Sequence, residues 1–103
     1  MSAGVGKIVV VRGFVARAMR KIGMAGITMP WRTIYLLPEF KDKQDLIAHE
    51  RVHVAQMTLD GPVWFSVRYL WWLARYGYWN NPYEIEAYEM APVDWTGIDL
   101  VKK

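Results

Sequence analysis

The first third of the chain carries two kinds of short apolar pattern. Residues 7–11, Lys-Ile-Val-Val-Val, are rich in β-branched side chains and favour a strand. The apolar positions then recur at helical spacing, which predicts a helix that starts near Phe14 and is ended by Gly23 and Gly26. The predicted apolar face of this helix consists of Phe14, Val15, Ala18, Met19 and Ile22.

After residue 26 the pattern changes to two short β-like segments. Residues 27–29 and 33–37 are mostly apolar or β-branched, with Pro30-Trp31-Arg32 between them and Pro38 after the second. Proline-containing breaks between such runs mark turns. We therefore predict a small β-hairpin.

The clearest helical pattern covers residues 42–59. Asp42 is the expected N-cap, and Asp45 is favourable in the first turn because the N-terminus of a helix attracts negative charge. Asp60-Gly61-Pro62 forms the stop signal. This helix is the firmest element that the pattern predicts.

The remaining pattern predicts two more helices. One begins at Pro62, runs to about Tyr76 and is rich in tryptophan; the other covers residues 83–90 and is rich in glutamate. Together these elements predict an α+β, mainly helical fold with a small β-hairpin or sheet before the 42–59 helix. We expect a single domain over residues 1–103, made of a basic arm with a short helix (1–25), a core (26–91) and a C-terminal tail (92–103).

Composition narrows the chemistry that this domain can perform. The chain has no cysteine, which excludes disulfides, cysteine-based metal sites and thiol nucleophiles, so any metal is held by histidines and carboxylates. The net charge is +3, but six basic residues precede the first acid, Glu39. The first third therefore carries +6 and residues 39–103 carry −3. This uneven balance by itself identifies no partner.

No segment has the pattern of a targeting or membrane-spanning sequence. The apolar run at residues 8–11 is too short for the core of a signal peptide. The most apolar stretch, residues 63–79, contains Arg68 and Arg75 and is shorter than the roughly 20 apolar residues that a span needs. A cytoplasmic location is expected, with peripheral membrane contact as an alternative for the amphipathic segments.

Both histidines of the chain stand in one motif, His49-Glu50-Arg51-Val52-His53, inside the 42–59 helix. At positions i and i+4 the imidazoles lie on one face, about 5–6 Å apart at Cβ, and both can reach one Zn²⁺. Glu50 lies about 100° around the helix. From there its carboxylate can reach a metal-bound water and act as a general base. The histidine face is bordered by Leu46, Val54 and Met57, so we expect it to point to an apolar interior. Unpaired imidazoles are costly in such an environment.

A catalytic zinc site needs a third protein ligand and an open fourth position. The chain has no third histidine, and its glutamate-rich helix offers the densest group of carboxylates. We choose Glu84, because it shares a face with small and apolar residues that can pack on the motif helix, whereas Glu86 and Glu89 point away. A reversed helix face would make Glu86 the ligand, and Asp94 and Asp99 are weaker candidates.

The pairing of this motif with a downstream glutamate helix resembles the gluzincin branch of zinc metallopeptidases. In its membrane-bound members the downstream pattern is Glu-x-x-Ala-Asp, and Glu84-Ile85-Glu86-Ala87-Tyr88 matches the Glu and the Ala but has tyrosine in place of Asp. The size is similar to that of the minimal gluzincins, and the layout resembles small phage and bacterial proteins with this motif. The resemblance covers residues 26–91 and implies a zincin-like domain.

This resemblance implies a set of roles. His49, His53 and Glu84 would be the zinc ligands, and Glu50 would polarise the water that attacks a scissile carbonyl. The segment before the motif helix is similar to the active-site edge strand of zincins. Residues 33–37 would then bind an extended peptide by adding it to the sheet.

Two features around the expected site stay open. The phenols of Tyr88, Tyr83 and Tyr76 are candidates for stabilising an oxyanion, with Tyr88 also suited to supporting a ligand, although each fits a packing role too. In the minimal gluzincins the tail can block the active site, so by resemblance residues 94–103 would cover the cleft in a latent form.

The tryptophan-rich helix has two distinct faces. We expect its aliphatic face to pack in the core: Val63, Val67, Leu70 and Ala74. We expect arginines to stack on aromatic rings on the other face, which consists of Trp64, Trp71, Trp72, Arg68 and Arg75. The alternative is a Trp/Arg surface that contacts a membrane or a partner protein.

The function expected from these patterns is that of a zinc-dependent metallopeptidase acting on peptide or protein substrates. The alternative from another class is a catalytically silent, metal-stapled binding or structural protein that acts through the Trp/Arg surface. A third interpretation, a basic nucleic-acid binder with incidental histidines, is accompanied by no nucleic-acid motif. We therefore expect no specific nucleic-acid partner.

Overall fold

The computed structural model describes residues 7–98. The fold is α+β and mainly helical, as the sequence predicts. A short 3₁₀ turn, Pro38–Phe40, leads from the strands to the longest helix. In chain order the elements are β1 (Lys7–Val10), α1 (Gly13–Ile22), β2 (Gly26–Met29), β3 (Thr33–Leu36), α2 (Gln44–Asp60), α3 (Pro62–Tyr76) and α4 (Pro82–Met90).

The strands form one small mixed sheet in the order β1-β3-β2. β2 and β3 make the predicted antiparallel hairpin, with Thr28 opposite Ile34, while β1 runs parallel to β3, with Ile8 opposite Ile34. The prediction that residues 33–37 form a free edge strand is wrong, because β1 occupies the second side of β3. Among the described strands, β2 is the edge that contacts α2.

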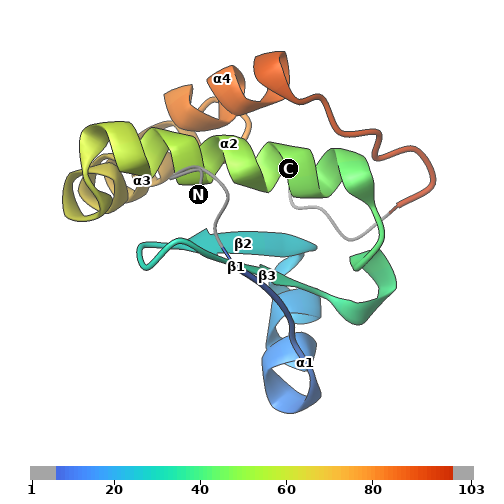
Figure 1. The fold of residues 1–103 in the computed structure, drawn as a ribbon. Helices are drawn as coiled ribbons and strands as arrows, with labels where there is room; N and C mark the ends of the chain where they lie inside the picture. The colour runs from blue at the N-terminus through green and yellow to red at the C-terminus, as the bar shows by residue number, and fades with distance from the viewer. Residues whose placement is uncertain (1–6, 99–103) are drawn as a thin grey trace.

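The motif helix α2 lies over one face of the sheet, and α1 lies on the opposite side (Figure 1). α4 crosses α2 on the side away from the sheet, and α3 packs beside α2. The main core fills the space between the sheet and α2, where Trp95 of the tail also packs, and consists of Ala25, Ile34, Leu36, Leu46, Ile47 and Val54. Since α2 is enclosed by β2, α3 and α4, side chains on its inner faces are withdrawn from water.

The predicted basic arm is built into the fold. Its strand pairs along the full length of β3, and its helix packs Ala16 and Met19 against Leu37 and Val11. Gly23 ends α1 with a left-handed backbone (φ 80°), and its N–H bonds the carbonyl oxygen of Arg20. A left-handed residue at this position favours glycine.

Helix boundaries follow most of the local signals. α3 has the predicted limits, and α2 ends at Asp60 as expected. The prediction of Asp42 as N-cap is wrong: α2 begins at Gln44 after Lys43, with no side-chain cap, because the preceding chain still turns through Pro38–Phe40. The first-turn carboxylate of Asp45 instead accepts a hydrogen bond from the N–H of Leu46 at 2.8 Å.

α3 faces the protein with its aromatic side, which corrects the prediction for its aliphatic face. Phe65 is buried against Met57 of α2 and Tyr83 of α4, with Tyr69 and Trp72 beside them. The predicted core residues are exposed instead: Val63, Val67, Leu70 and Ala74. The larger rings fill the gap between α2 and α4, so the aliphatic stripe is left outside. Of the predicted stacking pairs, Arg68 lies over Trp64 at 5.0 Å.

No helix among the described residues is long and apolar enough to cross a bilayer.

Candidate metal centre

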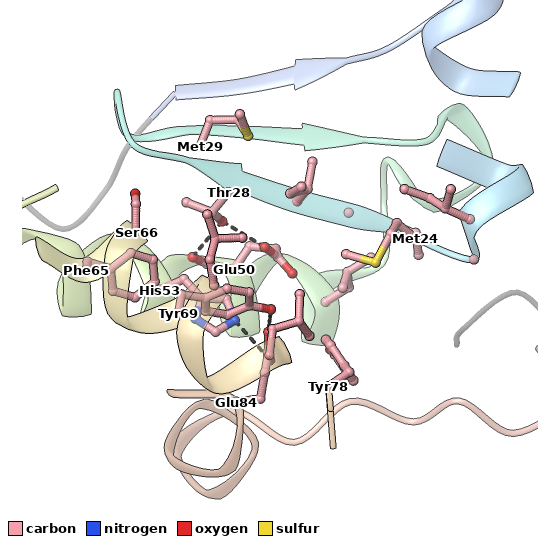
Figure 2. Close-up of a pocket in the computed structure, with 18 of the residues that line it drawn as sticks. Met24, Thr28, Met29, Glu50, His53, Phe65, Ser66, Tyr69, Tyr78 and Glu84 are labelled. Atoms are coloured by element: carbon pink, nitrogen blue, oxygen red, sulfur yellow. Dashed lines mark hydrogen bonds and ion pairs between the residues drawn. The ribbon is translucent and has the colours of Figure 1, made fainter. Parts of the chain in front are cut away.

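The two histidines of the motif lie on the buried face of α2, next to α3 and α4. His49 is 0% and His53 is 4% exposed, and their ring centroids are 4.9 Å apart. The i, i+4 spacing places both rings on one side of the helix. Both Nε2 atoms point to the same buried carboxylate of α4, that of Glu84. Figure 2 shows this contact for His53.

With Glu84, three possible metal-ligand atoms converge on one place and form a three-donor set for a metal ion. Its Oε1 lies 2.8 Å from His49 Nε2 and 3.1 Å from His53 Nε2, and the side chain is buried. Ligands bound to one tetrahedral zinc ion at roughly 2.0–2.2 Å lie about 3.3 Å from one another. The two distances from Glu84 to the imidazoles are thus a little shorter than the separation that a shared zinc ion requires.

Asn81 explains why α4 presents Glu84 at this point. Its side chain caps the helix by accepting a hydrogen bond from the N–H of Tyr83 at 3.0 Å. Its Nδ2 donates to the carbonyl oxygen of Tyr69 on α3 at 3.1 Å. Asn81 is fully buried, so this single side chain ties the start of α4 to the middle of α3.

Glu50 approaches the histidines from the side of the sheet. It is buried, and Thr28 of β2 donates a hydrogen bond to its Oε1 at 2.7 Å. His49, Glu50 and His53 each bring a ligand atom within 4.8 Å of the others. Because Thr28 holds the carboxylate toward β2, Glu50 lies beside the three-donor set and leaves Glu84 as the closer partner of the imidazoles (Figure 2).

The second ring nitrogens determine how the histidines face the centre. His53 Nδ1 lies 2.8 Å from Gln56 Oε1, and His49 Nδ1 lies 3.3 Å from the carbonyl oxygen of Ala91. Amide and carbonyl oxygens only accept hydrogen bonds, so Nδ1 carries a proton in both rings. Nε2 is then directed at the centre, which is the usual second-shell arrangement of a metal-binding histidine.

Gln56 is itself held by two acceptors. Its Nε2 donates to the carbonyl oxygen of Tyr83 at 3.0 Å and to Glu86 Oε1 at 2.7 Å. Glu86, the alternative ligand, is therefore exposed on the outside of the centre and supports Gln56. Asp94 is exposed as well, and Asp99 lies outside the described residues.

The electrostatics of the centre favour a positive charge between the imidazoles and Glu84. Burial disfavours the carboxylate of Glu84, but hydrogen bonds from His49, His53 and Tyr69 outweigh it and lower its pKa to about 2. Burial also opposes protonation of His53, yet contact with Glu84 and the charge of Glu50 raise its pKa to about 9. Burial raises the pKa of Glu50, and the two histidines only partly oppose this effect.

Tyr69 is the phenol that faces the centre. Its hydroxyl donates to Glu84 Oε2 at 2.5 Å, and its ring lies among the groups that line the adjacent cavity. The predicted Tyr88 packs against His49 with its ring tilted by 51° and the centroids 4.2 Å apart, and its hydroxyl bonds Tyr78 and Trp95. Of the other predicted phenols, Tyr83 bonds Asp60 and Tyr76 is exposed.

A cavity of about 610 Å³ lies next to Glu50, His53 and Glu84. Residues 22–30 form one wall, and α3 forms another through Phe65, Ser66, Tyr69, Leu70 and Leu73 (Figure 2). Trp95 of the tail also lines the cavity. The predicted covering of the cleft by residues 94–103 stays a prediction, because residues 99–103 lie outside the described part of the chain.

Sequence reasoning missed three residues that contact the centre: Thr28, Gln56 and Tyr69. Gln56 follows His53 by three residues and so shares its helical face, a signal that the sequence does contain. Thr28 is the polar residue between Ile27 and Met29 in β2. Tyr69 lies one turn after Phe65, so the two side chains share one face of α3. The sequence does not show that this face, and not the aliphatic one, packs against the protein.

Comparison with known proteins adds no relative to this geometry. No protein-family model matches the chain, and searches of curated proteins and of solved structures return no significant match. The resemblance to gluzincins therefore rests on the motif and on the glutamate helix alone.

Proposed function

We propose that the protein is a zinc-dependent metallopeptidase. The observation that carries this proposal is the convergence of His49 Nε2 and His53 Nε2 on one oxygen of Glu84, at 2.8 and 3.1 Å. Two histidines and one glutamate are a ligand set of catalytic zinc sites, which leave a fourth position open, whereas structural zinc sites are closed by four protein ligands. The donor set thus favours a hydrolytic zinc site over a metal staple.

The residues fit a divalent cation chemically as well as geometrically. In the metal-free protein the proton on His53 compensates the buried carboxylate of Glu84, and a divalent cation held by the same residues would supply that positive charge instead. When bound here, zinc would act as a Lewis acid toward the attacking water and the substrate carbonyl. Gln56 would hold the His53 ring through Nδ1, so that Nε2 keeps its direction.

Glu50 and Tyr69 take complementary roles in this proposal. Glu50 is the general base: it lies next to the ligands without being needed as one, and burial raises its pKa toward the working range of a proton acceptor. Thr28 keeps its carboxylate oriented. Tyr69 projects a hydroxyl to the cavity side of Glu84, where it can donate to a developing oxyanion.

A peptide substrate is supported by the edge strand beside the cavity. β2 pairs with β3 alone among the described strands, and Ile27, Thr28 and Met29 of β2 line the cavity next to Glu50. An edge strand offers backbone N–H and C=O groups that bind extended peptides. In this proposal β2 takes the peptide-binding role that was expected for residues 33–37. The expected cytoplasmic location is part of the same proposal.

The decisive experiment compares zinc content and hydrolysis in wild-type protein and in Glu50→Gln. We expect about one zinc per chain by elemental analysis of both proteins, purified without chelator or metal-affinity resin. We expect hydrolysis of a fluorogenic peptide library by the wild type, reduced by at least about 100-fold in the variant, because the proton acceptor is lost while the ligands remain. Glu89→Gln, an exposed glutamate of α4, is the matched control.

Three outcomes would contradict the proposal. Zinc-loaded wild type that cleaves no peptide would favour the metal-stapled binding protein, and equal hydrolysis by Glu50→Gln would exclude Glu50 as the base. Absence of zinc after its addition to folded protein would make the histidines structural. In that case, the nucleic-acid interpretation predicts binding that weakens steeply with salt.

A further inference from the structure

The side of α3 that faces away from the protein carries an uninterrupted apolar stripe. Five large side chains, spaced three, four or one residue apart, form this outer face of α3: Val63, Trp64, Val67, Leu70 and Trp71. They are between 50% and 75% exposed. Isolated apolar residues on a surface are ordinary, but a contiguous helical stripe of this kind marks a contact surface.

The stripe is not needed to build the fold. α3 attaches to α2 and α4 through its opposite side, where Phe65 is buried and Tyr69 and Trp72 pack. A helix usually buries its most regular apolar stripe against the core. In α3 the regular stripe is left to solvent and an aromatic side does the packing, so the outer face is available for a partner.

The charges of α3 indicate the chemistry of that partner. Arg68 and Arg75 are the only ionisable residues of the helix apart from tyrosines, and it carries no acid. Residues 39–103 carry −3 in total. Arg68 lies 3.9 Å from the carboxylate of Asp60 at the end of α2, so the positive charge that α3 offers to a partner comes mainly from Arg75. The guanidinium of Arg68 lies over Trp64 at 5.0 Å, and that of Arg75 lies over Tyr76 at 5.8 Å. Arginine next to exposed tryptophan on an apolar helix suits the boundary between anionic headgroups and acyl chains.

We propose that the outer face of α3 docks onto an anionic lipid surface, with its axis in the plane of the membrane. Trp64 and Trp71 would insert at the headgroup level, and Arg75 would contact lipid phosphates. Leu70 belongs both to this face and to the cavity wall, so docking places the cavity of the metal centre beside the membrane. This inference does not rest on the proposed function, because it uses no residue of the zinc ligand set.

The test is co-sedimentation of full-length protein with vesicles. We expect binding to vesicles that contain phosphatidylglycerol, and little binding to pure phosphatidylcholine. Val67→Glu should lower the affinity at least tenfold, because it places a negative charge inside the apolar stripe. Ile85→Glu on α4 is the matched control, since both residues are β-branched, helical and about half exposed (50% and 44%), and it should change the affinity less than twofold.

Arg75→Gln provides a second variant that leaves the apolar packing unchanged. It should weaken binding to anionic vesicles by a few-fold, and added salt should reduce this difference. Failure of the wild type to bind phosphatidylglycerol vesicles, or an equal loss in Ile85→Glu, would overturn the proposal. So would a dimer, measured by light scattering, that Val67→Glu dissociates while vesicle binding is unchanged; the stripe would then be covered by a second copy of the chain.

Discussion

The inner face of α2 and the outer face of α3 are opposite exceptions to the usual distribution of side chains. The inner face of α2 buries polar and ionisable groups, with His49, Glu50 and His53 at most 5% exposed. The outer face of α3 exposes large apolar groups, with Val63 and Trp71 at 75% and 63%. Protein interiors normally exclude the first kind of residue, and large contiguous patches of the second are uncommon on monomers.

This difference separates what each helix contributes. Each buried polar group of α2 has a partner: no buried side-chain nitrogen or oxygen among the described residues lacks a hydrogen bond. Those partners come from β2, α3 and α4, so the fold is organised around the centre. The large side chains on the outer face of α3 are instead left half to three-quarters exposed by the described residues. The first face should therefore respond to metal and pH, and the second to a surface outside the protein.

The largest effect is expected on zinc affinity, when the carboxylate of Glu84 is removed from the centre. Glu84→Ala should weaken zinc binding by more than about 100-fold, because loss of a ligand exceeds the 10- to 100-fold cost of losing a supporting residue. Competition with a chromophoric chelator measures the affinity. The matched variant is Glu86→Ala on the same helix, which should reduce affinity by about tenfold or less because Glu86 acts through Gln56.

A reversed order of these two variants would contradict the assignment of Glu84. It would mean that α4 can rotate to present Glu86 to the histidines, as the alternative helix face in the sequence analysis proposed. The buried hydrogen bond between Asn81 and the backbone of Tyr69 opposes such a rotation.

Much of this arrangement could be predicted because local signals carry it. Pro62 and the Asp60-Gly61 stop set the limits of α3 and the end of α2, and the i, i+4 spacing of the histidines set their common face. The face of α4 that brings Glu84 inward also followed from its small neighbour Ala87, which is fully buried. Each of these features depends on residues close together in the chain.

The errors concern choices that depend on distant residues. Pairing of β1 with β3 places β3 in the middle of the sheet, and this depends on a strand more than twenty residues away. The orientation of α3 depends on the gap between α2 and α4, which accepts Phe65 and Trp72 better than the smaller aliphatic residues. Periodicity shows that a helix has two faces, but it does not show which face finds a partner.

A weaker effect is expected from pH on the metal-free centre. The pKa of His53 is raised from 6.5 in the unfolded chain to about 9 in the folded one, because contact with Glu84 outweighs burial. Folding thus favours the protonated form, and its stabilisation is fully present below pH 6.5 and lost as the pH rises through 9. Chelator-treated protein should melt at progressively lower temperature between these two values in differential scanning calorimetry.

Zinc provides the control for this pH effect. Bound metal displaces the proton from the imidazole, so the melting temperature of zinc-saturated protein should vary much less over the same range. A melting temperature of the chelated protein that is constant or rises between pH 6.5 and 9 would contradict the ion pair between His53 and Glu84.

The smallest effect should come from the outer face of α3. Val67→Ser removes an apolar side chain that is half exposed, and valine and serine have similar helix propensities, so the free energy of unfolding in urea should change by less than about 0.5 kcal/mol. Val54→Ser on α2 is the matched comparison. Because Val54 is fully buried, this substitution should lower the free energy of unfolding by about 2 kcal/mol or more. If Val67→Ser costs as much as Val54→Ser, the stripe of α3 is already covered in the protein in solution. Both faces would then be buried in solution, the α2 face with polar groups and the α3 face with apolar groups, and the stripe would be part of the fold.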